Sequence, residues 1–242
     1  MEEKTLALAY RVTYQLDSGE VHDDQHPLLL AATPIQTLAP IRAPNNYRGQ
    51  HHITGLHYSP NTGHLHAFES RLEQSALLRI DFELRPQAIA TQPFALLYDD
   101  QGKRRGHIPD ILVGRTHTRP LVIDVNPKVF VEKNAGPFSA LRDACAEMGW
   151  DYAIWTEPNR AYASNLAFLY GYYRPLPGAA SVTAALLDRL TPGPLPLADL
   201  EADLGSPCLI RPILFHLLWT KMIHADLLRP LTDSTLINRE AA

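Results

Sequence analysis

Two apolar runs in the middle of the chain each carry an aspartate. Asp110 opens the run Ile-Leu-Val at 111–113, and Asp124 interrupts the run Leu-Val-Ile-Asp-Val at 121–125. An ionised carboxylate in a buried strand must be hydrogen-bonded, paired or given a cation, because burying it alone is costly. Asn126 shares the face of Asp124, since strand side chains alternate with a period of two. These residues are the first candidates for chemistry.

Two glutamates precede them on a predicted helix. Glu69 immediately precedes the stretch SRLEQSALLRIDF, and Glu73 lies near its start; the apolar residues of this stretch at 72, 76, 77 and 80 form a helical stripe. Glu73, Asp110 and Asp124 would repel one another unless a hard cation bridged them. Oxygen ligands without a thiolate favour magnesium or manganese over zinc. Such a site polarises a phosphodiester and activates water for in-line attack.

Each acid also has a structural interpretation. Ser70 and Glu73 have the spacing of a capping box, in which the glutamate closes the helix N-terminus. Asp110 follows Pro109 and is equally typical of a turn. Asp124 is harder to explain in this way, because all its neighbours in the run are apolar.

The elements around these residues predict an α/β fold with a mixed sheet flanked by helices. The predicted elements are a strand at 6–16, two short strands around a turn at 60–63, a helix at 70–82, a hairpin at 88–113, a strand at 119–127, a helix at 136–150, a strand at 151–157 and a helix at 163–173.

The C-terminal part has a different pattern. Helices are predicted at 181–190, 197–205 and 206–223, followed by a two-stranded wing at 224–239, which is the proportion of a winged-helix domain. The proline-rich stretch between the two parts marks a domain boundary. The predicted domains are an N-terminal strand and arm at 1–46, a nuclease-like domain at 47–175 and a winged-helix-like domain at 176–242.

Composition limits the possible partners. The chain has 242 residues and a net charge of −4, so DNA binding would need a local basic patch. Cys145 and Cys208 lie far apart without metal-type spacing, as expected in a reducing cytoplasm. The N-terminus lacks a signal peptide's order, and the most apolar stretch, 208–219, is too short to span a bilayer. A cytoplasmic protein without membrane contact is expected.

Basic residues could supply the patch. Lys103, Arg104 and Arg105 precede Pro109, and either form a solvated hairpin end or grip the DNA backbone, as could Arg48.

A group of histidines lies upstream. Residues 51, 52, 57, 64 and 66 are histidines, a density that suggests a metal site. No cysteine or carboxylate spacing completes a zinc site, however, and His64 and His66 alternate along a strand beside a turn. We interpret them as exposed strand histidines, some of which face phosphate.

The order of the acidic motifs resembles the PD-(D/E)xK nuclease superfamily, which has a glutamate on a helix, then Pro-Asp, then a strand with acid-x-Lys. More narrowly, the chain resembles the TnsA endonuclease family, subunits of heteromeric cut-and-paste transposases. The similar stretches are FESRLEQSALLRIDFE at 68–83, TQPFALLYDDQGKRRGHIPDILV at 91–113 and LVIDVNPK at 121–128, continued at 142–157. Together they cover roughly residues 47–170.

The resemblance implies a restriction-endonuclease-like fold and a Mg²⁺- or Mn²⁺-dependent endodeoxyribonuclease that hydrolyses phosphodiester bonds at transposon ends. It implies that Glu73, Asp110 and Asp124 are metal ligands and that Gln92 of the QPF motif supports the site. The implied partners are double-stranded DNA, an integrase-type transposase and an AAA+ ATPase, the last bound by the C-terminal domain.

The sequence departs from the family pattern at the motif lysine, where it has Asn126. That lysine orients the attacking water and offsets charge on phosphate. Lys128 is a possible substitute, but at about 3.3 Å per residue it starts about 13 Å from Asp124, and Pro127 is expected to end or kink the strand. Three interpretations stay open: a weakened endonuclease, a catalytically silent nuclease fold that serves DNA binding or assembly, and an unrelated α/β protein.

Overall fold

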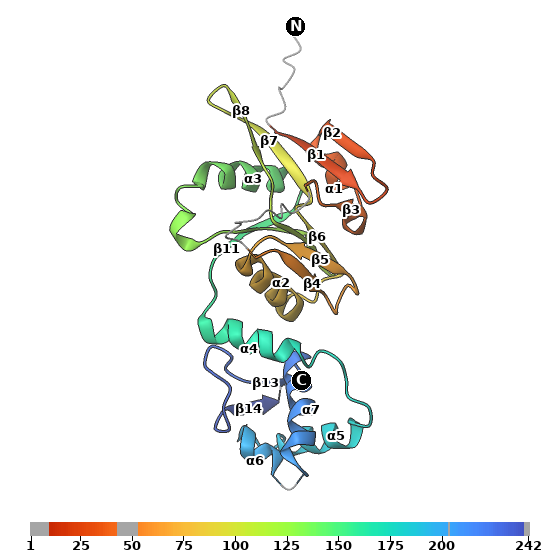
Figure 1. The fold of residues 1–242 in the computed structure, drawn as a ribbon, viewed down its shortest axis with the longest axis vertical. Helices are drawn as coiled ribbons and strands as arrows, with labels where there is room; N and C mark the ends of the chain where they lie inside the picture. The colour runs from red at the N-terminus through yellow and green to blue at the C-terminus, as the bar shows by residue number, and fades with distance from the viewer. Residues whose placement is uncertain (1–9, 43–52, 203, 240–242) are drawn as a thin grey trace. The chain divides into compact units, whose positions relative to one another are not determined.

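The computed structural model describes residues 10–42, 53–202 and 204–239, and it has a mixed α/β fold in two compact units, Met1–Glu157 and Pro158–Ala242 (Figure 1). The boundary lies earlier than the predicted break at 175/176. It precedes α4 (Arg160–Tyr170), because this helix packs against α7 (Pro207–Trp219) of the C-terminal unit. Within the described ranges, no helix combines the length and the apolar character needed to cross a membrane.

The N-terminal unit is built on a four-stranded sheet with the order β11-β10-β9-β6. β10 is parallel to β11 and antiparallel to β9, and β9 is antiparallel to β6, so the sheet is mixed as predicted. The strands are β6 (Ala88–Thr91), β9 (Ile111–Gly114), β10 (Leu121–Val125) and β11 (Asp151–Trp155).

Helices cover both faces of this sheet, with α2 (Arg71–Glu83) and α3 (Ala135–Glu147) on opposite sides (Figure 1). Alternate side chains of one strand enter different cores. Ile123 belongs to the core that includes α2, whereas Val122 belongs to the core that includes α3. The near-continuous apolar runs noted in the sequence therefore reflect burial on both faces.

A second sheet has the order β2-β1-β7-β8, with β3 beside β1. Its elements, with the short helices between them, are β1 (Tyr10–Leu16), β2 (Val21–Gln25), α1 (Pro27–Ala31), η1 (Ile35–Thr37), β3 (Leu38–Ala39), β7 (Phe94–Asp100) and β8 (Lys103–His107). The described part of the predicted N-terminal strand and arm, residues 10–42, is thus structured, and β1 lies within the strand predicted at 6–16. Its Val12, Tyr14 and Leu30 lie in the same core as α3, because β1 pairs with β7.

The stretch at 88–113, predicted as one hairpin, forms four strands in two sheets. The chain leaves the central sheet after β6, makes the hairpin β7–β8 in the second sheet, and returns as β9. Proline cannot donate a ladder hydrogen bond, and a proline stands at each crossing, Pro93 and Pro109. The exit and the return lie side by side, since the Gln92 N–H donates to the Asp110 carbonyl at 2.8 Å.

The C-terminal unit combines four helices with a three-stranded sheet of order β12-β14-β13. Its remaining elements are α5 (Ala180–Arg189), β12 (Leu195–Pro196), α6 (Leu197–Glu201), β13 (Ile223–His224) and β14 (Leu236–Arg239). Leu186, Leu200, Leu214 and Ile237 are fully or almost fully buried, so this unit has its own core.

Candidate acidic site

Asp110 stands where the chain re-enters the central sheet. Its Oδ2 accepts a hydrogen bond from the Val125 N–H at 2.7 Å, which ties the end of β10 to the start of β9. Burial raises the pKa of Asp110 well above its ordinary value, and the negative charges of Glu73 and Asp124 raise it further. The charges of an acid on α2 and an acid on β10 therefore act on Asp110, while a cation shared by the three acids stays a prediction.

Glu73 lies in the first turn of α2 and also has its structural role. One carboxylate oxygen accepts from the Ser70 hydroxyl at 2.9 Å, and the other accepts from the Glu69 N–H at 2.8 Å. The Ser70 oxygen in turn accepts from the Glu73 N–H at 3.1 Å, which gives a variant of the capping box whose return bond comes from the Glu69 N–H rather than from the Ser70 N–H. Burial is the main cause that raises the pKa of Glu73. The cap and the acidic site use the same side chain.

Asp124 on β10 is 2% exposed and has two side-chain partners. His107 Nε2 lies 2.9 and 3.1 Å from its two carboxylate oxygens, and the Tyr152 hydroxyl donates to Oδ2 at 2.6 Å. Burial and then the charge of Asp124 raise the pKa of Tyr152, so this hydroxyl keeps its proton. These partners fix the orientation of the Asp124 carboxylate.

The sequence reasoning missed both partners of Asp124. Tyr152 could have been found from strand periodicity. It lies on β11 opposite Val122 of β10, and Val122 shares a face with Asp124 because the two are two residues apart. His107 comes from the end of β8 in the other sheet, and no local pattern connects it to β10.

Two amide side chains beside these acids carry buried polar atoms that have no hydrogen-bond partner among the described residues. Gln92 is 1% exposed, and neither its Oε1 nor its Nε2 has a partner within the described structure. Its φ of 46° lies in the left-handed region, which is strained for a non-glycine residue. Asn126 Oδ1 is likewise buried without a partner there. Unpaired buried polar atoms are uncommon and often mark a functional position.

Lys128 does not continue the strand. β10 ends at Val125, and Lys128 opens the 3₁₀ turn η2 (Lys128–Phe130) after Pro127. The Lys128 N–H donates to Glu157 Oε2 at 3.0 Å, and its side chain is exposed. The expected break at Pro127 is therefore observed, while the part of Lys128 in any reaction stays a prediction.

Arg42 is a cation at this site that sequence reasoning did not identify. Its Nη2 lies 2.6 Å from Glu69 Oε2. Its charge lowers the pKa of both Glu73 and Asp110, against the larger effect of burial. The residue follows β3, far from the acids in sequence, so only the fold brings it there.

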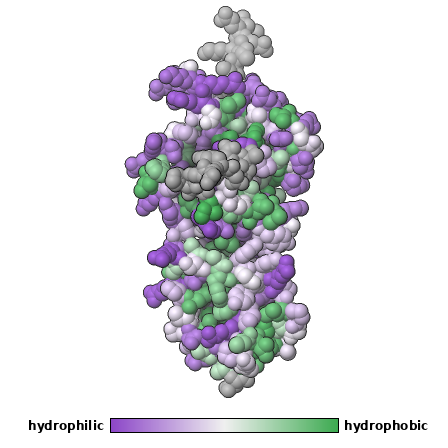
Figure 2. Space-filling view, in the orientation of Figure 1, coloured by the Kyte–Doolittle hydropathy of each residue, from purple (hydrophilic) through white to green (hydrophobic). Residues whose placement is uncertain are grey.

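The basic residues of the β7–β8 hairpin, which were predicted to contact DNA, differ in their ion-pair partners. Lys103, Arg104 and Arg105 are exposed on β8, at the end of the hairpin that Figure 2 shows in the purple of hydrophilic residues. Arg104 forms an ion pair with Asp24, and Arg105 Nε lies 3.7 Å from Asp100 Oδ2. Arg48 lies outside the described residues.

The histidines correct one interpretation. His57 on β4 (Gly55–Tyr58) and His66 on β5 (Leu65–Phe68) are 4% and 9% exposed, rather than open to phosphate. His57 Nε2 lies 2.6 Å from Asp81 Oδ2, because α2 presents Asp81 to this hairpin. Burial lowers the pKa of His66 to about 4. His64 is exposed, and residues 51 and 52 lie outside the described residues.

The side chains of the candidate site have the donor atoms that a hard cation prefers, but they are too far apart to hold one in this conformation. Among the described residues, no three or more His, Cys, Asp or Glu side chains gather closely enough to hold an ion as they stand. The available donors are nonetheless carboxylate and amide oxygens, including the unpartnered oxygens of Gln92 and Asn126. Magnesium and manganese prefer such donors. Asp124 would have to exchange part of its bonding to His107 and Tyr152.

Comparison with known proteins adds no relative. No model of a protein family matches the chain, and no curated protein matches it significantly.

Proposed function

We propose that this protein is a metal-dependent DNA endonuclease of the TnsA kind, which hydrolyses phosphodiester bonds at the ends of a mobile element as one subunit of a heteromeric transposase. The observation that carries the proposal is the electrostatic coupling of Asp110 to both Glu73 and Asp124. A divalent cation would offset the repulsion among these acids, and the hydrogen bond from the Val125 N–H to Asp110 Oδ2 fixes Asp110 beside the end of β10, which carries Asp124.

The residues divide the work of hydrolysis between them. Glu73, Asp110 and Asp124 would hold Mg²⁺ or Mn²⁺, which supplies polarisation of the phosphodiester and activation of water. Asn126 would orient the attacking water by a hydrogen bond. The water oxygen bonds to phosphorus as one ester P–O bond breaks, and the released alkoxide takes up a proton. Gln92, held beside Asp110 by its backbone, would contribute its free amide to the same cluster.

We assign the C-terminal unit a winged-helix-like architecture. The element order α5, β12, α6, α7, β13, β14 and the three-stranded sheet support this assignment. In DNA-reading domains of this class, the recognition helix supplies side chains to the base edges. The corresponding helix here is α7. If this unit recognises a DNA sequence, α7 must carry polar side chains that are available to bind base edges.

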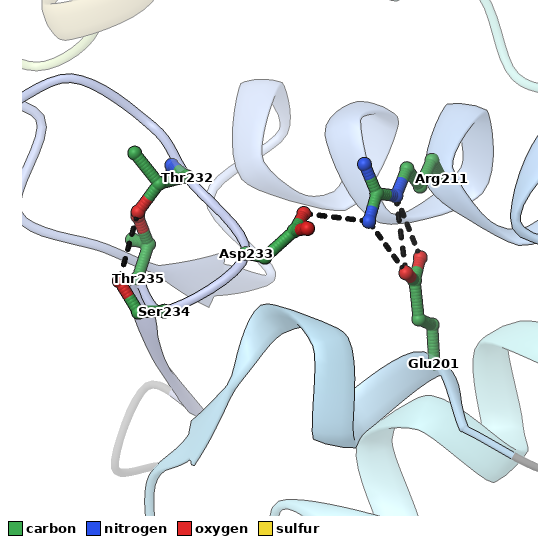
Figure 3. A network of polar contacts seen from close by, with 6 residues as sticks. All are labelled: Glu201, Arg211, Thr232, Asp233, Ser234 and Thr235. Carbon is green, nitrogen blue, oxygen red and sulfur yellow. Dashed lines mark hydrogen bonds and ion pairs between the residues drawn. The ribbon is translucent and has the colours of Figure 1, made fainter.

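α7 offers little to DNA. Its arginine, Arg211, is bound by two carboxylates, with Nη2 2.7 Å from Glu201 Oε1 and 2.7 Å from Asp233 Oδ1 (Figure 3). The rest of the helix is largely apolar, with Ile213, Leu214 and Leu217 buried. These features favour protein assembly over sequence reading, in line with binding of an AAA+ ATPase.

A second function is favoured by two observations. Asn126 supplies no charge, and both oxygens of Asp124 already have partners in His107 and Tyr152. A nuclease fold that has lost catalysis and serves as a DNA-binding or assembly subunit would have these properties.

Nicking of duplex DNA in the presence of the partner proteins tests the proposal. The full-length chain should nick slowly, and better with Mn²⁺ than with Mg²⁺. Asp110→Asn should abolish nicking, while Asp188→Asn, an exposed acid of the other unit, should leave it unchanged. Asn126→Lys should accelerate nicking, by up to about 10²–10³ for a restored contact, and Lys128→Ala should have little effect. If no variant cuts with either metal, the silent subunit is the correct interpretation.

A truncation tests the division of labour. The segment 1–157 should fold alone, since the two units have separate cores. It should keep its contacts with DNA and lose binding to the partner ATPase. An insoluble product would show that the units depend on each other for folding.

A further inference from the structure

The backbone at Arg42 is fastened to the acidic site. The preceding residue, Ile41, donates its N–H to the Gln92 carbonyl at 2.9 Å, and the Gln92 N–H donates to the Asp110 carbonyl at 2.8 Å. Two consecutive hydrogen bonds therefore connect the segment after β3 with the point where Asp110 enters the sheet. Arg42 begins from a fixed position.

The side chain of Arg42 is fastened from the other side. Its guanidinium pairs with Glu69 at 2.6 Å, and the Glu69 N–H donates to Glu73 Oε2 at 2.8 Å. Arg42 is thus linked to the start of α2 through Glu69, and to the Gln92–Asp110 crossing through the backbone of Ile41. Its charge also lowers the pKa of Glu73 and of Asp110, against the larger effect of burial.

We propose that Arg42 is the residue that contacts the scissile phosphate and supplies the positive charge missing at position 126. The inference rests on the proposed function. About half of the Arg42 side chain is exposed (51%), so an incoming phosphate can reach it, and Glu69 holds it at the site before DNA arrives. A guanidinium binds phosphate oxygens with the same two parallel N–H donors that it offers a carboxylate, so a phosphate can take the place of Glu69.

The chemistry of arginine limits this role to charge stabilisation. A guanidinium keeps its proton throughout the accessible pH range, so Arg42 forms no bond with phosphorus and delivers no proton. It offsets the charge that develops on the non-bridging phosphate oxygens as water attacks and the ester bond breaks. The proton for the released alkoxide must come from water or another acid.

The other basic residues fit this role less well. The β7–β8 hairpin carries Lys103, Arg104 and Arg105 at its far end from the Gln92 and Pro109 crossings. Lys128 has left the line of β10. Arg42 is linked to the carboxylates by contacts on both sides.

Nicking rates at saturating DNA, with partners and Mn²⁺ present, test the catalytic part. Arg42→Ala should slow nicking by about 10²–10³-fold, and Arg42→Lys should recover part of the loss. In the Arg42→Ala protein, adding Asn126→Lys should restore at least about tenfold, because a charge returns to the phosphate. Arg229→Ala, which removes an exposed arginine of the C-terminal unit, is the matched control. A nicking rate for Arg42→Ala equal to wild type would overturn the proposal.

DNA affinity provides a readout that does not require cleavage. DNA affinity is measured with Ca²⁺ and a fluorescein-labelled duplex at several salt concentrations. The slope of the logarithm of affinity against the logarithm of salt concentration should be shallower by about 1 in Arg42→Ala than in wild type, as expected for one lost phosphate contact. Arg229→Ala should keep the wild-type slope. If the wild-type protein never cuts, the nuclease function fails, but this slope still decides whether Arg42 binds phosphate. An unchanged slope in Arg42→Ala, in protein with wild-type melting, would refute the contact.

Discussion

Asp81 and Asp110 are carboxylates of the same unit with opposite surroundings. Asp81 is 2% exposed and is matched by donors: His57 Nε2 at 2.6 Å, the Ser59 hydroxyl at 2.5 Å and the Asn61 amide at 2.8 Å. Asp110 accepts one backbone N–H and faces the negative charges of Glu73 and Asp124.

The comparison distinguishes a buried carboxylate that stabilises the fold from one that costs stability. The Asp81 network joins α2 to the hairpin β4–β5 and leaves its carboxylate satisfied, which is how buried polar groups stabilise a fold. Around Asp110, by contrast, like charges meet, and within the described residues the Gln92 amide and Asn126 Oδ1 lack partners. A site that costs stability in this way needs another reason to persist, and the proposed cation and DNA would supply one.

The largest effect is expected at the satisfied carboxylate. Asp81→Ala removes the acceptor shared by the buried side chains of His57 and Ser59 and by the exposed Asn61 amide, and should lower the free energy of unfolding by about 3–5 kcal/mol. Urea denaturation of the full chain measures this change. Asp188→Ala, at an exposed position, serves as the control. A loss below about 1 kcal/mol, the scale of an ordinary hydrogen bond, would show that Asp81 is not a structural anchor.

A smaller effect of opposite sign is expected at Gln92. Gln92→Leu keeps the size of the side chain and the strained backbone but removes two unpaired polar atoms. It should raise the free energy of unfolding by about 1–3 kcal/mol in metal-free buffer, the usual cost of such a group. The same substitution should slow nicking. A less stable Gln92→Leu protein would mean that the amide is already satisfied, and the contrast with Asp81 would weaken.

The pH dependence should distinguish Asp110 more subtly. Because the pKa of Asp110 is raised in the folded state, the folded protein binds this proton more tightly than the unfolded chain does. The resulting stability is fully present below the ordinary pKa of about 4 and is lost as pH rises through the folded value. Asp110→Asn should remove this loss, so its melting temperature relative to wild type should increase from pH 4 towards pH 8. A constant difference across that range would contradict the raised pKa.

Sequence reasoning found the acids because their motifs are local. Asp110 and Asp124 are conspicuous in apolar runs, and strand periodicity placed Asn126 on the face of Asp124. Asp81 carried a signal that went unused, since it lies four residues after Leu77 and adjoins Ile80, both fully buried on α2. Its place in the buried stripe predicts a polar partner.

Other features depend on contacts between distant segments. His107 meets Asp124 only because β7–β8 belongs to a different sheet from β6 and β9, an exchange that alternating hydrophobicity cannot reveal. Arg42 follows a two-residue strand whose pairing with β1 no local pattern predicts. The residues that follow the predicted N-terminal strand were expected to be an arm for the same reason.

Calorimetric titration with Mn²⁺ tests the central claim most directly, namely that the coupled acids form a cation site. Wild-type protein should bind one ion at the site, with a rise in melting temperature from binding to the folded state. Asp110→Asn should lose both the heat and the rise, whereas Asp188→Asn should keep them. If wild type shows neither signal, or if Asp110→Asn binds as wild type does, Glu73, Asp110 and Asp124 do not form a metal centre.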